Sequence, residues 1–416
     1  MKNKQNVPQV RFKGFTDAWE QRELGDMMNV TSVKRIHQSD WTDSGIRFLR
    51  ARDIVSAAKN EEPDDYLYIS KEKYDEYSSI SGKVAIGDML VTGVGTIGVP
   101  YLIRNSEPLY FKDGNIIWFQ NGSKIDGDFF LYSFIGQTIQ NFIHESAGIG
   151  TVGTYTIESG KKTPISLPKK EEQQQIGSYF RNLDHLITLH QRKCETLQKL
   201  KKSMLQKIFP KNGSLYPEIR FAGFTDAWEQ RELGEISEKI TRKNQDIVCN
   251  EVFTNSAEFG IISQRDFFDK DIANSENIDG YYIVEPDDFV YNPRISTLAP
   301  FGPIRRNKLG RTGAMSPLYY VFRTHDVDYG FLEYFFKTNG WHSFMHLNGN
   351  SGARSDRFAI RDDIFKEMPI TMPQDIVEQQ LIGEYFTNLD TVITLHQRKL
   401  ETLKKLKKSM LRKMFI

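Results

Sequence analysis

Two long segments of this 416-residue chain are nearly identical, and each predicts one long helix. They run from Glu172 to Phe209 and from Glu378 to Phe415. Apolar residues recur at alternating steps of four and three, which is typical of a helix packed along its whole length against another helix. The expected seam consists of Ile176, Phe180, Leu183, Ile187 and Leu197 in the first segment, and of Ile382, Phe386, Leu389, Ile393 and Leu403 in the second.

Because one chain carries both helices, the simplest partner for each is the other, in an antiparallel coiled coil with a pseudo-two-fold axis. A helix of about 35 residues is roughly 50 Å long, whereas B-DNA repeats its groove every ~34 Å. Such a rod is suited to hold two domains over grooves that lie at least one turn apart.

Polar residues also fall on this seam. His190 and His396 occupy equivalent places, where each is either a register-setting or pH-sensitive contact or a histidine tolerated at the edge of the coil. Lys201 and Lys407 are expected to extend their charged ends into solvent, so that the leucine before each takes the core position. The basic ends of both segments are either solvated faces, favoured at a helix C-terminus, or contacts to phosphate.

A shorter string, FTDAWEQRELG, occurs at Phe15–Gly25 and again at Phe224–Gly234. Asp17 followed by Glu20 fits the start of a helix that the closing glycine ends. Alternating side chains fit a strand equally well, so the sequence leaves both structures open. The residues expected to pack the rest of each half onto this string are Phe12, Phe15, Trp19 and Leu24.

The two repeats give the chain two halves with the same plan. We call the stretch between the repeats of each half a body: residues 26–168 form the first body and residues 235–373 the second. The bodies have similar lengths but different sequences, and repeats of this size are duplicated domains. A PKNG linker after the first long segment marks a boundary. The expected domains are residues 1–168 and 211–373, and the coiled-coil helices lie in residues 169–210 and 374–416.

Each body predicts strands followed by an aromatic helix. Strand-like apolar runs lie at 89–91 and 115–119 in the first body and at 281–284 and 318–322 in the second. Helix-like runs follow at 129–135 and 331–336. The predicted fold class is therefore α+β, with two globular α/β domains separated by the paired helices.

The amino-acid composition excludes only a few classes of function. Apolar residues make up 39% and charged residues 26%, as in soluble globular proteins. The net charge of +1 means that DNA binding would require locally concentrated positive charge or help from a partner. The chain has neither an apolar run of membrane-spanning length nor a signal-peptide core, which favours a cytoplasmic location. Cys194 and Cys249 lie in no CxxC motif or Cys/His cluster, which disfavours a disulfide or a zinc site.

The sequence contains no catalytic motif, and its two glycine-rich matches to a nucleotide-binding motif lack the expected flanking secondary structure. GVGTIG at Gly93–Gly98 and GIGTVG at Gly148–Gly153 match the dinucleotide pattern, but neither has the required strand–loop–helix order. We interpret both as structural turns, or as turns that bring threonine hydroxyls close to another surface. There is no P-loop lysine, HExxH or GxSxG motif. We therefore expect a non-catalytic chain that binds no metal and no cofactor.

Arginine combined with Asn, Ser and Thr on Gly-rich loops is typical of contacts to base edges and phosphates, although ordinary loop polarity is the alternative. The candidate DNA-binding residues of the first body are Arg50, Arg52, Thr92, Thr96, Thr151 and Thr154. Those of the second body are Arg294, Ser296, Thr297, Arg305, Arg306, Lys308, Arg311, Arg354, Ser355 and Arg357.

Over essentially its whole length the chain resembles the DNA-specificity subunit of type I restriction–modification systems. The resemblance rests on the EEQQQI lead between Pro168 and Ile176, the VEQQLI lead at Val377–Ile382, and the tandem bodies. It is strengthened by the phrases GDMLVTGVGTIG at 87–98 and DDFVYNPRIS at 287–296.

The resemblance implies that each body is a target-recognition domain that reads one half of a bipartite site in double-stranded DNA, and that the paired helices set the gap. The implied partners are two methyltransferase subunits, which use S-adenosylmethionine to methylate adenine N6, and two motor–nuclease subunits, which use ATP and Mg²⁺. Because the bodies differ, the site should be asymmetric. The alternatives are a coiled-coil adaptor with two protein-binding domains and a self-sufficient enzyme of nucleic-acid metabolism.

Overall fold

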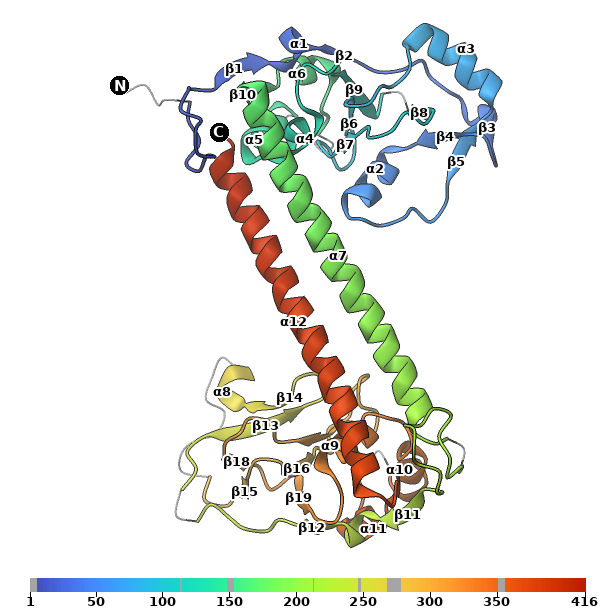
Figure 1. The fold of residues 1–416 in the computed structure, drawn as a ribbon, viewed down its shortest axis with the longest axis vertical. Coiled ribbons are helices and arrows are strands. Elements are labelled where there is room, and N and C mark those ends of the chain that lie inside the picture. The colour runs from blue at the N-terminus through green and yellow to red at the C-terminus, as the bar shows by residue number, and fades with distance from the viewer. Residues whose placement is uncertain are drawn as a thin grey trace. The chain divides into compact units, whose positions relative to one another are not determined.

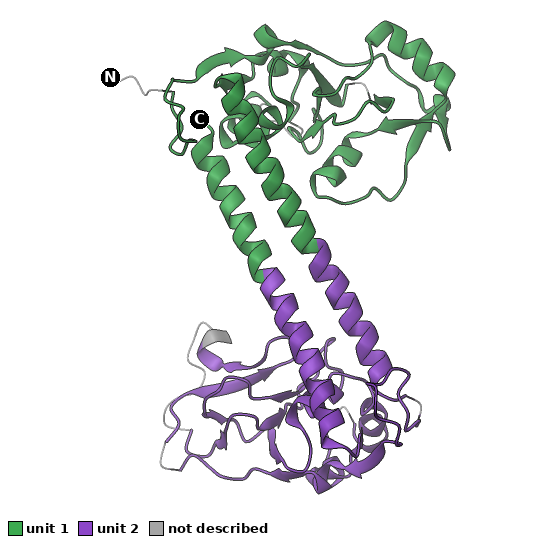
Figure 2. Cartoon of the chain, viewed as in Figure 1, with its two compact units in different colours: residues 1–191, 398–416 green, residues 192–397 purple. Residues whose placement is uncertain are grey.

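The computed structural model describes residues 6–112, 114–147, 153–211, 213–245, 248–267, 278–350 and 356–416. The chain divides into two compact units (Figure 2). Unit 1 consists of residues 1–191 and 398–416, and unit 2 of residues 192–397. Each unit therefore contains one body and a part of each long helix.

The described part of unit 1 holds two four-stranded sheets and a two-stranded ribbon (Figure 1). One sheet is antiparallel with the order β2-β9-β6-β7; the other has the order β3-β5-β4-β8, in which β4 and β8 run parallel. The ribbon pairs β1 with β10. The strands are β1 Glu20–Glu23, β2 Asn29–Thr31, β3 Trp41–Thr42, β4 Ile46–Leu49, β5 Leu67–Ile69, β6 Met89–Thr92, β7 Pro100–Leu102, β8 Leu109–Phe111, β9 Ile116–Gln120 and β10 Pro164–Leu167.

The helices of the first body cover its sheets and carry much of its aromatic core. The predicted helix at 129–135 is confirmed as α4, which Asp126 caps by accepting a hydrogen bond from Phe129 N–H at 3.0 Å. Phe129, Phe130 and Phe134 of α4 are fully buried. The helices are α1 Leu24–Met27, α2 Ala51–Ala58, α3 Lys71–Ser81, α4 Gly127–Ile135, α5 Gln137–Ser146 and α6 Ile157–Lys161, with a 3-10 turn at Gln38–Asp40.

The described part of unit 2 also holds two four-stranded sheets and a two-stranded ribbon, but the strand order of its second sheet differs from that in unit 1. Its sheets have the orders β12-β19-β16-β17 and β14-β13-β18-β15, and its ribbon pairs β11 with β20. The strands are β11 Glu229–Glu232, β12 Ser237–Lys239, β13 Val252–Ser256, β14 Gly260–Ser263, β15 Tyr282–Val284, β16 Phe289–Tyr291, β17 Ile304–Arg306, β18 Gly313–Met315, β19 Tyr320–Thr324 and β20 Pro369–Met372. The helices are α8 Gln264–Phe267, α9 Tyr329–Phe335, α10 His342–Asn348 and α11 Asp362–Lys366, with a 3-10 turn at Leu233–Glu235.

The same local rules build equivalent strands in the two bodies. The turn before β6 is closed by the buried Asp88 carboxylate, which accepts a hydrogen bond from Ala85 N–H at 2.9 Å. Before β16, buried Asp288 accepts one from Glu285 N–H at 2.7 Å. The residue before each of these aspartates, Gly87 or Asp287, has a positive φ, of 92° and 68° respectively. Different sequences thus satisfy one turn geometry, so β6 and β16 are equivalent strands although most residues of the two bodies differ.

The short repeat forms a strand, which settles the choice that the sequence left open. β1 pairs antiparallel with β10, and β11 pairs with β20 in the same register. The tryptophans before these strands, Trp19 and Trp228, are buried at 3% and 1% exposure. Only a short turn of helix, α1, follows in the first copy. Pairing with the last strand of each body holds the repeat extended, and therefore prevents the helix.

The long repeats form the helices α7 Lys170–Ile208 and α12 Ile376–Met414, which run antiparallel where they pack together within each unit. In unit 1 the ring of Phe180 on α7 lies 5.7 Å from that of Phe415, just beyond α12, and Asp184 pairs with Lys407. In unit 2 Lys201 pairs with Asp390. The expected seam residues Ile176, Phe180, Leu183, Ile187, Leu197, Ile382, Phe386, Ile393 and Leu403 are all buried, and Leu389 is half-buried.

The lysines on the seam differ from the prediction. The side chains of Lys201 and Lys407 are only 19% and 22% exposed, and each reaches an aspartate of the other helix at 2.5 Å. The leucines expected to replace them, Leu200 and Leu406, are each 38% exposed. The prediction failed because an aspartate lies opposite each ammonium group and compensates its loss of solvent. No helix in the described residues is both long and apolar enough to cross a membrane.

Candidate nucleic-acid interface

Each body is anchored to the start of its own long helix by a buried ion pair. Arg11 donates two hydrogen bonds to Glu172, at 2.6 and 2.7 Å, and the Glu172 side chain has no exposed surface. Arg220 makes the same bidentate contact with Glu378 at 2.7 and 2.8 Å. The hydrogen bond that Arg11 donates to Glu172 raises the pKa of Arg11. This pair explains why an arginine precedes each short repeat and a glutamate begins each long one.

The next residue of each long repeat holds the capped helix of the body. Gln173 accepts a hydrogen bond from Asp126 N–H at 3.0 Å, and Gln379 accepts one from Asp328 N–H at 2.8 Å. Each glutamine amide also donates to the carbonyl of the proline just upstream of its helix. Gly177 and Gly383 let α4 and α9 approach closely, because a Cβ at Gly177 would lie 2.6 Å from the Asp126 carboxylate and one at Gly383 would lie 2.9 Å from that of Asp328.

A tyrosine of each body completes the attachment. The Tyr132 hydroxyl donates to Asp184 at 2.7 Å, and the Tyr334 hydroxyl donates to Asp390 at 2.8 Å. Each of these aspartates also accepts from the seam lysine of the opposite helix, as described above. Burial, followed by the hydrogen bond to Asp184, raises the pKa of Tyr132 well above its usual range. Body, helix and partner helix are therefore joined in one hydrogen-bonded chain in each unit.

In the second body the structure brings two predicted recognition segments together. An antiparallel bridge joins Arg294 to Arg357, and Ile295 N–H donates to the carbonyl of Asp356 at 3.0 Å. Ser296 and Thr297 are exposed in the tight turn that follows. The Arg294 side chain is 70% exposed, and its nearest carboxylate, that of Asp356, lies 3.8 Å away. This loop pair thus presents arginine and hydroxyl groups to solvent, as contacts to base edges require.

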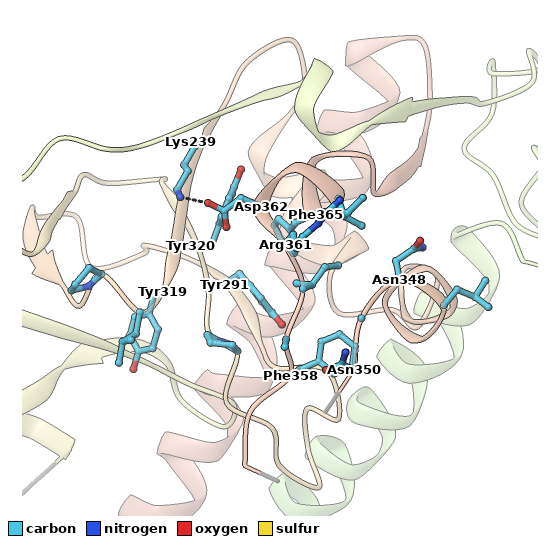
Figure 3. A pocket seen from close by; sticks show the side chains of 18 residues that line it. Lys239, Tyr291, Tyr319, Tyr320, Asn348, Asn350, Phe358, Arg361, Asp362 and Phe365 are labelled. Carbon is cyan, nitrogen blue, oxygen red and sulfur yellow. Dashed lines mark hydrogen bonds and ion pairs between the residues drawn. The ribbon is translucent and has the colours of Figure 1, made fainter. Parts of the chain in front are cut away.

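A pocket of about 740 Å³ adjoins this loop pair, and both Pro293 and Phe358 line it (Figure 3). Its aromatic wall includes Tyr291, whose ring stacks on that of Phe365 with centroids 4.8 Å apart. Lys239, which also lines the pocket, is paired with the carboxylate of Asp362 on α11.

Other predicted candidates of the second body are held by neighbouring groups. Arg306 pairs with buried Glu333 at 2.8 Å, and Lys308 reaches the same carboxylate at 3.2 Å. Arg311 makes a bidentate contact with Glu251 at 2.7 Å. The half-buried Arg305 donates only to backbone carbonyls among the described residues, and burial lowers its pKa. We infer that these four arrange β17 and the loop after it.

Glu333 is the centre of that charge network. Burial alone would raise its pKa, but Lys337, Lys308 and Arg306 together lower the pKa of Glu333 to about 2. Its side chain is 6% exposed and lies on α9, directly before Tyr334. In the first body the equivalent place on α4, before Tyr132, is held by Leu131. The charged attachment of β17 to α9 is therefore specific to the second body.

Some candidate DNA-binding residues of the first body are likewise paired with neighbouring groups, and others are exposed. Arg50 caps α2 and pairs with Asp53 and Asp65, each at 2.9 Å, while the exposed Arg52 also contacts Asp65. Thr92 is fully buried, and its hydroxyl bonds within the β6–β7 turn. Thr96 in that turn and Thr154 are exposed. The remaining candidates, which lie outside the described residues, are Thr151, Arg354 and Ser355.

The GVGTIG stretch is a hairpin turn, as the sequence predicted. Gly93–Gly98 joins β6 to β7, and Gly98 N–H donates to the Thr92 carbonyl at 2.7 Å. A strand and not a helix follows, so this loop lacks the helix N-terminus on which a dinucleotide phosphate rests. Within the described residues, no group of three or more His, Cys, Asp and Glu side chains is placed to hold a metal ion.

The sequence reasoning missed the anchoring residues of this interface. Arg11, Asp184 and Tyr132 were not named as functional, although each has an identical counterpart in the other half of the chain. Identity at polar positions between two otherwise divergent copies was the available signal. It indicates the contacts that the two halves make in common, which are those that attach each body to the helices.

A model of the type I restriction modification DNA specificity domain matches residues 16–199 and, a second time, residues 225–405. The chain belongs to this family. It is 34% identical over 170 residues to a Haemophilus influenzae protein that carries the name of a type I restriction enzyme specificity subunit, covering 40% of this chain and 41% of that one. It is 25% identical over 203 residues to the MjaVIII specificity subunit of Methanocaldococcus jannaschii, covering 46% and 45%.

In these matches the chain spans about half the length of each relative. Among solved structures, the type I restriction–modification S subunit from M. genitalium has a TM-score of 0.59 and 12% identity and covers 99% of both chains. At this identity the likeness shows the fold alone. It agrees with the predicted architecture of two α+β domains and two long helices.

Proposed function

We propose that this chain is the DNA-reading subunit of a type I restriction–modification complex, in which each body recognises one half of an asymmetric bipartite site. The observation that carries the proposal is the attachment of two bodies, which share one sheet topology but differ in the other sheet and in their exposed loops, to matching helices by matching contacts. Two domains that read unlike half-sites require the same attachment to the helices and different recognition loops. Membership in the specificity family supports this function over that of a coiled-coil protein adaptor.

The partners follow from the same proposal. Two methyltransferase subunits would dock around α7 and α12 and use S-adenosylmethionine to methylate adenine N6, and two motor–nuclease subunits would use ATP and Mg²⁺ for cleavage. This chain would bind neither cofactor and supply no catalytic group. Its near-neutral net charge fits a reader whose partners provide part of the phosphate contacts. Such a subunit acts on DNA in the cytoplasm.

The proposal is tested by selecting binding sites from random duplex DNA with the full chain assembled with its methyltransferase subunit. We expect enrichment of two unlike short motifs separated by a gap of fixed length. Binding that depends on salt alone, with no motif enriched, would sink the proposal. Enrichment of a palindrome would retain the DNA reader but contradict the independent reading by two different bodies.

Substitution of Arg294 tests whether the second body reads one of the two half-sites. Replacing Arg294 by Ala should weaken recognition by about 1–3 kcal/mol and relax one half of the motif, while the other half remains intact. Arg242→Ala is the matched control, because Arg242 in the same unit is similarly exposed, at 67%, and similarly far from its carboxylate partner, at 3.6 Å. Relaxation of both halves together, or the same effect from both variants, would contradict the assignment.

A further inference from the structure

A basic cleft lies in unit 1, where the last turns of α12 pass the junction of α4 and α5 (Figure 1). Its volume is about 350 Å³. The residues that give it its character are Lys404, Lys407, Lys408, Arg412, Asp184 and Gln137. The cleft is distinct from the loops of the first body that the sequence singled out for base recognition.

Positive charge is in excess in this cleft. Lys407 is neutralised by Asp184 at 2.5 Å. Lys404, Lys408 and Arg412 are exposed, and none of them forms an ion pair with a residue that the structure describes. Because they are four residues apart they form one row on the helix, with a rise of about 6 Å between neighbours. Like charges at this spacing destabilise a helix, so the row costs stability that no ion pair with a described residue offsets.

The corresponding end of α7 in unit 2 lacks this row. From Lys193 and Lys399 to the final phenylalanines, the two long repeats differ at only four positions. Two of these differences exchange one apolar or thiol side chain for another. The other two place Lys404 where α7 has Gln198 and Arg412 where α7 has Gln206. Both added cations line the cleft, so the only polar divergence in this part of the repeat concentrates positive charge at one site.

We propose that this cleft binds the phosphate backbone of double-stranded DNA beside the half-site read by the first body. The inference rests on the proposed function and adds a contact that strengthens binding without reading sequence. Phosphates are bound by Lys and Arg together with neutral amide donors, and the cleft offers Asn60 and Gln137 in addition to its cations. Its one acidic lining residue is already paired. Gln137 begins α5, whose N-cap residue Gly136 has no side chain to accept from the first turn.

The test replaces Lys404 and Arg412 by glutamine, the residue that the other repeat carries at both positions. The full chain, assembled with its methyltransferase subunit, is titrated with a random-sequence duplex and with a duplex that carries the selected site, between about 50 and 200 mM salt. Loss of two phosphate contacts should reduce the slope of log affinity against log salt by roughly 1.8. The ratio of the wild-type DNA affinity to that of the double variant should therefore fall about 12-fold across this range, and the preference for the selected site should stay the same.

A charge-matched control separates the cleft from net charge. Adding Gln198→Lys and Gln206→Arg to the double variant restores the total charge but places it on α7. The proposal predicts that the salt slope stays low. Recovery of the slope would overturn the proposal, and so would an unchanged slope in the double variant. Weakened binding of the methyltransferase at an unchanged slope would also overturn it, and would indicate that the cleft binds an acidic protein surface. A wild type without site preference would refute the proposed function alone, because the difference in salt slope still reports on the cleft.

Discussion

The buried anchor between Arg11 and Glu172 makes a quantitative prediction about the first body. Replacing Arg11 by Ala leaves a carboxylate with no exposed surface and no cationic partner. Removing one member of a buried ion pair costs about 3–5 kcal/mol, because the remaining charge is desolvated without compensation. The pair ties the segment that leads into β1 to the first turn of α7, which follows β10 closely in the chain, so we expect the loss of stability to appear in these elements first.

Hydrogen exchange of the full chain, read by mass spectrometry, measures this loss locally. A cost of 3–5 kcal/mol corresponds to exchange that is roughly 160-fold to 5,000-fold faster in β1, β10 and the start of α7. The β11–β20 ribbon is the internal control, since its own pair, Arg220 with Glu378, stays intact. Arg11→Met combined with Glu172→Met should recover most of the protection, because both charges are then absent. Unchanged exchange in β1, or equal acceleration in both ribbons, would refute the reasoning.

Three further predictions concern packing, pH and helix register. Gly177→Ala should destabilise the chain by about 1–3 kcal/mol in thermal or denaturant unfolding, since its Cβ would meet α4, whereas Gly280→Ala, with open space around it, should be neutral. The low pKa of Glu333 means that its contribution to stability is complete above about pH 4.5 and declines as the pH falls toward 2, so the destabilisation by Glu333→Gln at neutral pH should shrink in that window. Inserting four residues after Gln198 should change or abolish the gap in the selected site, because four residues rotate the seam out of register, and an unchanged gap would contradict the spacing role.

Much of the fold was predictable because its signals are local or repeated. The step of four and three residues from Ile176 onward predicted α7, and the same step in the second copy predicted α12 and its antiparallel pairing. The apolar runs around Met89 and Ile117 are strands, as predicted, because buried strands carry continuous runs of apolar residues. The α+β class follows from these elements and is confirmed.

The candidate site was less predictable because charge balance depends on residues that are distant in sequence. Arg306 resembles a DNA contact when read as part of a basic string, but Glu333 lies beside it only after folding. The seam lysines failed as predictions for the same reason: the aspartate opposite Lys407 lies 223 residues away in the sequence. Which exposed arginines touch bases stays a prediction, because single-chain geometry shows availability and not contact.

The central claim, that each body reads its own half-site independently on a common mount, is tested most directly by giving the chain two copies of one reader. Residues 233–368 would be replaced by residues 24–163, which keeps both ribbons and both helices, and the binding site of the assembled complex would be selected again from random duplex DNA. We expect an inverted repeat of the first half-site in place of the asymmetric site. Recovery of the original asymmetric site would contradict the central claim.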